Sequence, residues 1–306
     1  SFEEALMKGW RSIGQGLGYP EIIKWKKEKL EDKLRVPNDQ RLTIIWNYLK
    51  RGNASPKRIQ RTCELTDFHP FFIERIGELV KIENKLEKVK KNIPKNMLLK
   101  AKRNGFGDSH ISKLTGKKEE TIRNQRKRMN ITSSFLMVDT CAGEFEAKTP
   151  YFYSTYADQK LKYKIEKSIV ILGSGPIRIG QGIEFDYSTV HGVQAVRKAG
   201  YEAVVVNNNP ETVSTDFDAS DRLYFEPLDA ESVFEIMDAE EPYGIILQLG
   251  GQTAVNLASE VEAYIKKEKL KTRILGTKVR DMDAAEDRGK CGELMRKAGI
   301  EMPEWA

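Results

Sequence analysis

Cysteine, histidine and long apolar runs are all scarce in this sequence. Its 306 residues include only 3 cysteines and 3 isolated histidines. Because Cys63, Cys141 and Cys291 are far apart and odd in number, they exclude a disulfide framework and a zinc cluster and favour a reducing compartment. No apolar stretch approaches the ~18 residues of a membrane span, and no signal peptide opens the chain. We therefore expect a cytoplasmic protein with no membrane contact and no metal site within this chain.

The charge is divided unevenly along the chain. The formal net charge is +6. Up to Lys164 there are 35 Lys and Arg against 20 Asp and Glu, a balance of +15, whereas the remainder carries −9. Together with a length that suits about two domains of ~150 residues, this asymmetry indicates two modules with different surfaces. The chain starts without methionine and ends just after a predicted helix and Pro303, so we expect it to be a piece of a larger protein.

The first module is predicted to be helical throughout. Its apolar residues recur at the three- and four-residue spacing of amphipathic helices, in the ranges 2–10, 21–34, 39–51, 56–66 and 70–90. Pro70 is expected in the first turn of its helix, where its missing N–H costs nothing. The aromatic segment 135–156 is interpreted as an irregular but ordered strap at the domain junction.

The second module alternates short apolar strands with helices. The predicted strands are 169–172, 203–207, 222–225, 244–248 and 273–275, and the predicted helices are 187–199, 230–239, 253–268 and 278–298. This alternation predicts a parallel sheet covered on both faces, a Rossmann-like α/β domain. Ligands of such sheets bind beyond the carboxyl ends of the strands. The sequence thus predicts a multi-domain protein, an all-α domain followed by an α/β domain.

A glycine-rich loop follows the first of these strands. It runs Gly173-Ser-Gly-Pro-Ile-Arg-Ile-Gly-Gln-Gly182 and precedes a helix, an arrangement that points backbone N–H groups at an anion. Yet a dinucleotide fingerprint needs glycine in place of Arg178, and a P-loop needs lysine in place of Gln181. The loop is therefore interpreted as an anion site of neither standard type. Its candidate residues are Gly173, Ser174, Gly175, Arg178 and Gly180.

Two more loops of this kind follow other strands. In Asn207-Asn-Asn-Pro-Glu-Thr212, asparagines stand where an NAD-binding fold usually has an acidic residue, which disfavours a dehydrogenase. The asparagines either only turn the chain, or Asn209, Glu211 and Thr212 face the same crevice as the glycine loop. In the third loop, Gly250, Gly251 and Gln252 precede Thr253, a predicted helix N-cap.

Two carboxylates beside the glycine loop complicate the anion hypothesis. Glu184 and Asp186 would repel a phosphate unless a cation intervenes or they face elsewhere. Alternatively, Glu184 and Glu211 could line a polar passage for a small neutral or cationic molecule. The residues alone leave both interpretations open.

These motifs together resemble the large chain of carbamoyl phosphate synthetase. The similarity extends over essentially the whole chain. It is carried by the loops above, with the first extended to Tyr187, and by 206–218, Asp221-Arg-Leu-Tyr-Phe-Glu-Pro227, Asp139-Thr-Cys-Ala-Gly-Glu-Phe145, Tyr153-Ser-Thr-Tyr156 and Lys102-Arg-Asn-Gly-Phe-Gly-Asp108.

The resemblance implies a division of the chain and a function. Residues 1–160 would be the helical oligomerisation domain, 161–280 the pre-ATP-grasp domain of the carbamoyl-phosphate-forming half, and 281–306 the truncated start of the ATP-grasp region. The complete enzyme would be a ligase that makes carbamoyl phosphate for arginine and pyrimidine synthesis from bicarbonate, glutamine-derived ammonia and ATP.

The resemblance also implies roles for individual residues and for partners. Gly182, Glu184 and Glu211 would line the tunnel that delivers carbamate. ATP and Mg²⁺ or Mn²⁺, with K⁺ as a further candidate, would bind outside this chain, which would hold no catalytic residue and be inactive alone. Implied partners are the small glutaminase chain, the remaining large-chain domains and further copies bound through the helical domain.

One segment of the basic module suggests a different function. Residues 107–116 followed by Glu119-Glu-Thr-Ile-Arg-Asn-Gln-Arg-Lys-Arg128 have the pattern of a helix-turn-helix with a basic second helix. A nucleic-acid-binding regulator with a small-molecule-binding α/β domain is therefore the alternative hypothesis. The family resemblance favours a packed helix pair, whose basic face is solvated or meets a partner chain, over this alternative. We therefore expect no nucleic-acid partner.

Overall fold

The computed structural model describes residues 1–13, 27–157, 167–176 and 183–301. The chain divides into two compact units. The first comprises Ser1–Ser134 with Thr155–Asp158, and the second comprises Phe135–Ser154 with Gln159–Ala306. Residues 135–154, most of the segment interpreted as a strap at the domain junction, pack with the second unit. None of the described helices is long and apolar enough to cross a membrane.

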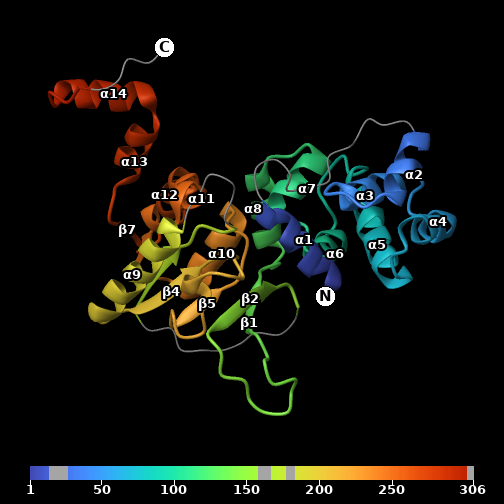
Figure 1. The fold of residues 1–306 in the computed structure, drawn as a ribbon, viewed down its shortest axis with the longest axis horizontal. Helices are drawn as coiled ribbons and strands as arrows, with labels where there is room; N and C mark the ends of the chain where they lie inside the picture. The colour runs from blue at the N-terminus through green and yellow to red at the C-terminus, as the bar shows by residue number, and fades with distance from the viewer. Residues whose placement is uncertain (14–26, 158–166, 177–182, 302–306) are drawn as a thin grey trace. The chain divides into compact units, whose positions relative to one another are not determined.

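The first unit is built from helices (Figure 1). They are α1 (Phe2–Ile13), α2 (Lys27–Arg35), α3 (Arg41–Arg51), α4 (Pro56–Thr66), α5 (Pro70–Leu86), α6 (Lys95–Arg103), α7 (Asp108–Thr115) and α8 (Glu119–Arg128). As predicted, α5 begins at Pro70, and the ring nitrogen of His69 accepts the N–H of Phe71. One continuous apolar core joins these helices, with Trp46 almost fully buried in it.

Buried charges hold α6, α7 and α8 together within this unit. The carboxylate of Asp108 accepts from the guanidinium of Arg126 at 2.9 and 3.1 Å and from Lys102 Nζ at 3.1 Å. All three side chains are at most 1% exposed. Arg126 also donates to the carbonyl of Ile131 at 3.0 Å, and its guanidinium lies over the ring of Tyr156. A buried charge needs such partners because desolvation is costly.

The second unit contains one sheet of seven strands among the described residues, in the order β1-β2-β5-β4-β3-β6-β7. The pairs from β2 to β7 are all parallel. The strands are β1 (Ser134–Met137), β2 (Tyr151–Thr155), β3 (Ser168–Leu172), β4 (Glu202–Val206), β5 (Arg222–Tyr224), β6 (Gly244–Ile246) and β7 (Arg273–Leu275). The connecting helices are α9 (Glu184–Lys198), α10 (Ala230–Glu240), α11 (Gly251–Val255), α12 (Ala258–Glu268), α13 (Val279–Glu286) and α14 (Arg288–Lys297), with 3₁₀ turns η1 (Val213–Thr215) and η2 (Gln248–Gly250).

The two faces of the sheet follow the two-residue period of its strands. Val170 and Leu172 point into a core with α10, α11 and α12. Ile169 and Ile171 point into a second core with Val193 and other residues of α9. Both faces are thus covered, and the predicted sequence of an all-α domain followed by an α/β domain is confirmed.

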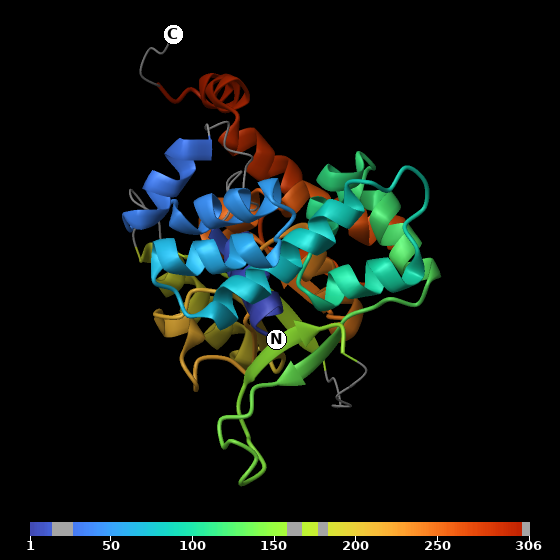
Figure 2. The ribbon, with the colours of Figure 1, turned by 90° about the vertical axis from the view of Figure 1, so that its right-hand side faces the viewer.

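Some local predictions differ from the structure. The segment 135–156 contributes strands β1 and β2, and the loop between them extends away from the sheet (Figure 2). The predicted helix 253–268 is split into α11 and α12. The helix 278–298 is broken at Asp287, whose side chain accepts the N–H of Lys290 and so starts α14.

Candidate functional site

Three loops of the second unit meet at the carboxyl edge of its sheet. β3 pairs with β4 on one side and with β6 on the other. The helix α9 that follows β3 covers one face, whereas α10 and α12 cover the other. This is the point of a doubly wound sheet where the chain order reverses and where ligands bind. The loops after β3, β4 and β6 begin at Gly173, Asn207 and Leu247.

The loops after β3 and β6 touch through their backbones. A side chain at Gly250 would collide with the carbonyl oxygens of Leu172 and Gly173. The neighbouring Gly251 has a φ of +62°, and a Cβ there would lie 2.8 Å from the ring of Phe185. Gly250 is therefore required for the close approach of the two loops. Gly251 is required both for its close contact with Phe185 and for its positive φ, which favours glycine.

Asn207 organises the loops after β3 and β4. Its Oδ1 accepts the N–H of Gly175 at 3.0 Å and the N–H of Asn209 at 3.2 Å. Its Nδ2 donates to Ser214 Oγ at 3.2 Å, and the side chain is 1% exposed. The Oδ1 of Asn209 in turn accepts the N–H of Glu211 at 3.0 Å. The first asparagine is therefore a positioning residue, which is more than the turn-forming role that its type suggests.

Asp186 binds the backbone at the start of η1. Its two carboxylate oxygens accept the N–H groups of Val213 and Ser214, each at 3.0 Å, and it is 7% exposed. It therefore fixes η1 to α9. Sequence patterns missed this role, because the bonds join residues 27 and 28 positions apart.

The same pair of hydrogen bonds brings two exposed carboxylates into one region. Glu184 stands two residues before Asp186, and Glu211 stands two residues before Val213. Both glutamates are exposed. No lysine or arginine belongs to 173–176, 207–215 or 247–253. The described part of this edge therefore offers neutral hydrogen-bonding groups bordered by negative charge, whereas Arg178 of the glycine loop lies outside that part.

The other predicted site residues differ in their burial and contacts. Ser174 and Asn209 are buried, and Thr212 is half-buried, with its carbonyl accepting from Thr215 Oγ1 at 2.8 Å. Gln252 is exposed and donates to Asn256, away from the loops. Thr253 lies inside α11, whose N-cap is Gly250, so the predicted N-cap role of Thr253 is wrong. Arg178, Gly180 and Gly182 lie outside the described residues.

The side chains that usually bind metals are scattered in this chain. The described residues contain no group of three or more His, Cys, Asp or Glu side chains placed to hold a metal ion. Of the histidines, His110 is stacked on Phe106 and buried, and its pKa is lowered to about 3, mainly because burial penalises the charged ring. His191 packs against Tyr187 on α9.

Known families and proteins match almost the whole chain. Residues 165–284 match the carbamoyl phosphate synthase pre-ATP-grasp domain, and residues 1–130 match the oligomerisation domain of the carbamoyl-phosphate synthetase large chain. Carbamoyl phosphate synthase large chains of Methanothrix thermoacetophila and Methanosarcina mazei are each 46% identical over 308 aligned positions, 99% of this chain. The chain belongs to the carbamoyl phosphate synthase large-chain family. It spans 28% of the length of these two relatives.

The motif that begins at Asp221 stabilises the fold of this large-chain family member. Asp221 lies at the opposite edge of the sheet from the loops, where it accepts the N–H of Ala203 at 2.7 Å and pairs with Arg197 at 2.9 Å. Partial burial alone would raise the pKa of Asp221, but the bonds from Arg197 and Ala203 lower it overall. Next to it, Arg222 forms a buried ion pair with Glu240. These charges tie β4, β5 and α10 together.

The predicted helix-turn-helix is present as the pair α7 and α8. However, Arg126 of the basic helix is fully buried in its contact with Asp108. Arg123 is 11% exposed and pairs with Glu119 at 3.1 Å. A recognition helix must present such side chains to the bases. The structure therefore favours a packed helix pair over a nucleic-acid interface.

Proposed function

We propose that this chain contributes a wall of the carbamate passage and oligomer contacts to a carbamoyl phosphate synthetase large chain. In the complete enzyme, the reaction would form carbamoyl phosphate from bicarbonate, glutamine-derived ammonia and ATP. The observation that carries the proposal is the pair of hydrogen bonds from η1 to Asp186, which sets Glu184 and Glu211 on two adjoining segments.

The chemistry of these loops suits passage more than tight binding. A carboxylate wall repels a carbamate anion, so the intermediate would move along it without being retained. The backbone contact at Gly250 and the Asn207 bonds fix the wall in one shape, and fixed loops exclude competing water. Residues 182, 184 and 211 are proposed as the lining.

The described residues do not fit a nucleotide and metal site. The three loops carry no lysine or arginine within 173–176, 207–215 and 247–253, and the part of the chain that the structure describes has no cluster of metal-ligating side chains. We propose that ATP and Mg²⁺ bind elsewhere in the large chain and that this chain alone is inactive.

The partners are proposed from the family membership of the chain. They are the small glutaminase chain, the other large-chain domains and further copies of the chain. A cytoplasmic location and a role in arginine and pyrimidine synthesis complete the proposal, and they rest on the family membership alone.

Replacing Glu184 tests the passage role directly. In the complete large chain with its glutaminase partner, Glu184→Ala should uncouple ATP hydrolysis from carbamoyl phosphate formation, because carbamate escapes before it reacts. The ratio of ATP consumed to product formed should rise severalfold, while the concentration of ATP giving half-maximal rate stays unchanged.

A matched variant separates this effect from a general loss of charge. Glu260 is an exposed carboxylate on α12, and Glu260→Ala should leave the ratio unchanged. Parallel decreases of ATP hydrolysis and product formation in Glu184→Ala, with an unaltered ratio, would count against the passage.

A further inference from the structure

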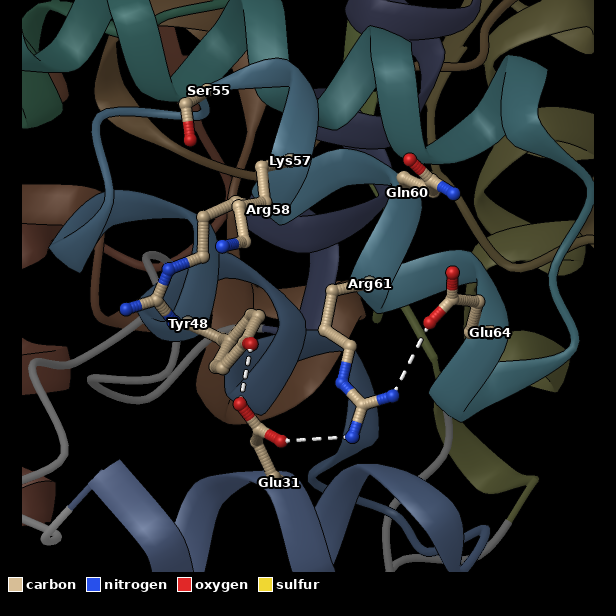
Figure 3. A pocket seen from close by; sticks show the side chains of 8 residues that line it. All are labelled: Glu31, Tyr48, Ser55, Lys57, Arg58, Gln60, Arg61 and Glu64. Atoms are coloured by element: carbon tan, nitrogen blue, oxygen red, sulfur yellow. Dashed lines mark hydrogen bonds and ion pairs between the residues drawn. The ribbon is translucent and has the colours of Figure 1, made fainter.

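The helical unit contains a polar cavity that the proposed function does not use. It has a volume of about 530 Å³ and is lined from α2, α3 and α4 (Figure 3). This volume is within the range of small-molecule sites. Figure 3 shows Arg58 beside Tyr48, and Glu31 between Tyr48 and Arg61, which also reaches Glu64.

The carboxylates of the cavity already have partners. Arg61 NH2 lies 3.3 Å from Glu31 Oε2, and its NH1 lies 3.2 Å from Glu64 Oε2. The hydroxyl of Tyr48 donates to Glu31 Oε1 at 2.7 Å. One arginine and one tyrosine thus engage both glutamates, and the charges of Arg61, Glu31 and Glu64 sum to −1.

Two cations of the cavity have no carboxylate partner among the described residues. The Arg58 guanidinium stacks on Tyr48, with Cζ 4.2 Å from the ring centroid, and its NH1 is buried with no hydrogen-bond partner in that part of the chain. Lys57 is exposed at the rim. A buried donor without an acceptor is costly, and Lys57 and Arg58 bring the net charge of the lining residues to +1.

The backbone makes room for this arrangement. At Gly52, a Cβ would lie 2.5 to 2.9 Å from Cγ, Nε and Cδ of Arg58. The absence of a side chain there lets the arginine stem lie flat against the end of α3. The guanidinium is thereby held at the cavity and not extended into solvent.

We propose that this cavity binds a small phosphorylated molecule, with its phosphate on Lys57 and Arg58. Phosphate oxygens supply the missing acceptors, and hydrogen bonds between a charged donor and a charged acceptor are the strong ones. The carbohydrate or other hydroxyl-bearing part of such a ligand would donate to the remaining lone pairs of Glu31 and Glu64. This site is separate from the sheet edge and independent of the carbamate passage.

Titration calorimetry with inorganic pyrophosphate tests the proposal on the purified 306-residue chain. We expect saturable binding with one site per chain. Lys57→Gln and Arg58→Gln should each weaken it tenfold or more. Gly52→Ala should weaken it severalfold although it removes no charge, because it displaces the Arg58 stem.

The control is Lys90→Gln, which removes the same charge from a position outside the cavity. It should change the dissociation constant less than twofold. Lys57 is exposed, so the Lys57→Gln variant is expected to keep the thermal unfolding midpoint and to report on binding alone. Absence of saturable binding, or equal binding by Lys57→Gln and the control, would overturn the proposal.

Discussion

At the scale of single residues, the requirement for glycine differs between positions of this chain. Gly250 is required because the carbonyls of Leu172 and Gly173 occupy the space of a side chain. Gly9, in contrast, is exposed in α1, and a Cβ added there would meet no atom within 4 Å, so its lack of a side chain serves no close packing. Residue type alone does not distinguish these cases.

This contrast gives a stability prediction. Gly250→Ala should lower the free energy of unfolding by about 1–3 kcal/mol, because the clash is with backbone that cannot rotate away. Gly9→Ala should raise it by about 0.5–1 kcal/mol, since alanine is the better helix former. Urea denaturation of both variants checks this. A neutral Gly250→Ala would mean that the two loops are not in contact in solution.

At the scale of elements, the buried charges of α6, α7 and α8 act as one unit. We expect Asp108→Asn to cost about 3–5 kcal/mol of unfolding free energy, because it leaves Arg126 and Lys102 buried without a counter-charge. An exposed pair provides the comparison: Glu78→Gln, which removes the charged partner of Lys81, should cost less than about 1 kcal/mol.

Denaturant unfolding measures both values. Similar small effects of the two substitutions would show that water reaches Asp108. If Arg126 instead served nucleic-acid recognition, Asp108→Asn would release it and strengthen binding to duplex DNA. We expect no such gain in a filter-binding assay.

The elements differ in how well the sequence predicts them. The five parallel strands from β3 to β7 were predicted, because short apolar runs between helices identify buried strands. β1 and β2 were not, since their aromatic residues show no clear alternation and their position depends on β5, far along the chain. Helix breaks were missed for a similar reason, as at Asp287, whose capping bond does not alter the apolar pattern.

The candidate site was predictable only in outline. The rule that parallel strands end at one edge gathers the three loops correctly. Which side chains face the site depends on tertiary hydrogen bonds. Asp186 was grouped with Glu184 from its charge, yet it binds the backbone of η1 while Glu184 is exposed. The roles of residues 182, 184 and 211 stay predictions.

At the scale of the whole molecule, we expect self-association through the helical unit. Its match to an oligomerisation domain accords with an exposed aromatic cluster, in which Phe71 and Phe72 are 43% and 44% exposed and pack against Phe2. Apolar surface of this kind usually marks an interface.

Sedimentation equilibrium tests this expectation. The weight-average mass should rise with concentration, and Phe72→Ser should weaken the association at least tenfold. Phe145→Ser removes an aromatic ring that is 76% exposed in the second unit and should have no effect. A strictly monomeric chain at high concentration would contradict the prediction.

The division of the chain between its units also bears on the order of events during synthesis. The chain leaves the first unit after Ser134, returns at Thr155 and leaves again after Asp158. On the ribosome, Tyr151 therefore emerges well before Leu223, its partner in the sheet. At ordinary elongation rates of about 5–20 residues per second, β2 must wait several seconds for β5 with an unpaired edge. This chain is thus most open to wrong strand pairing after the helices of its first unit are complete and before its sheet has formed.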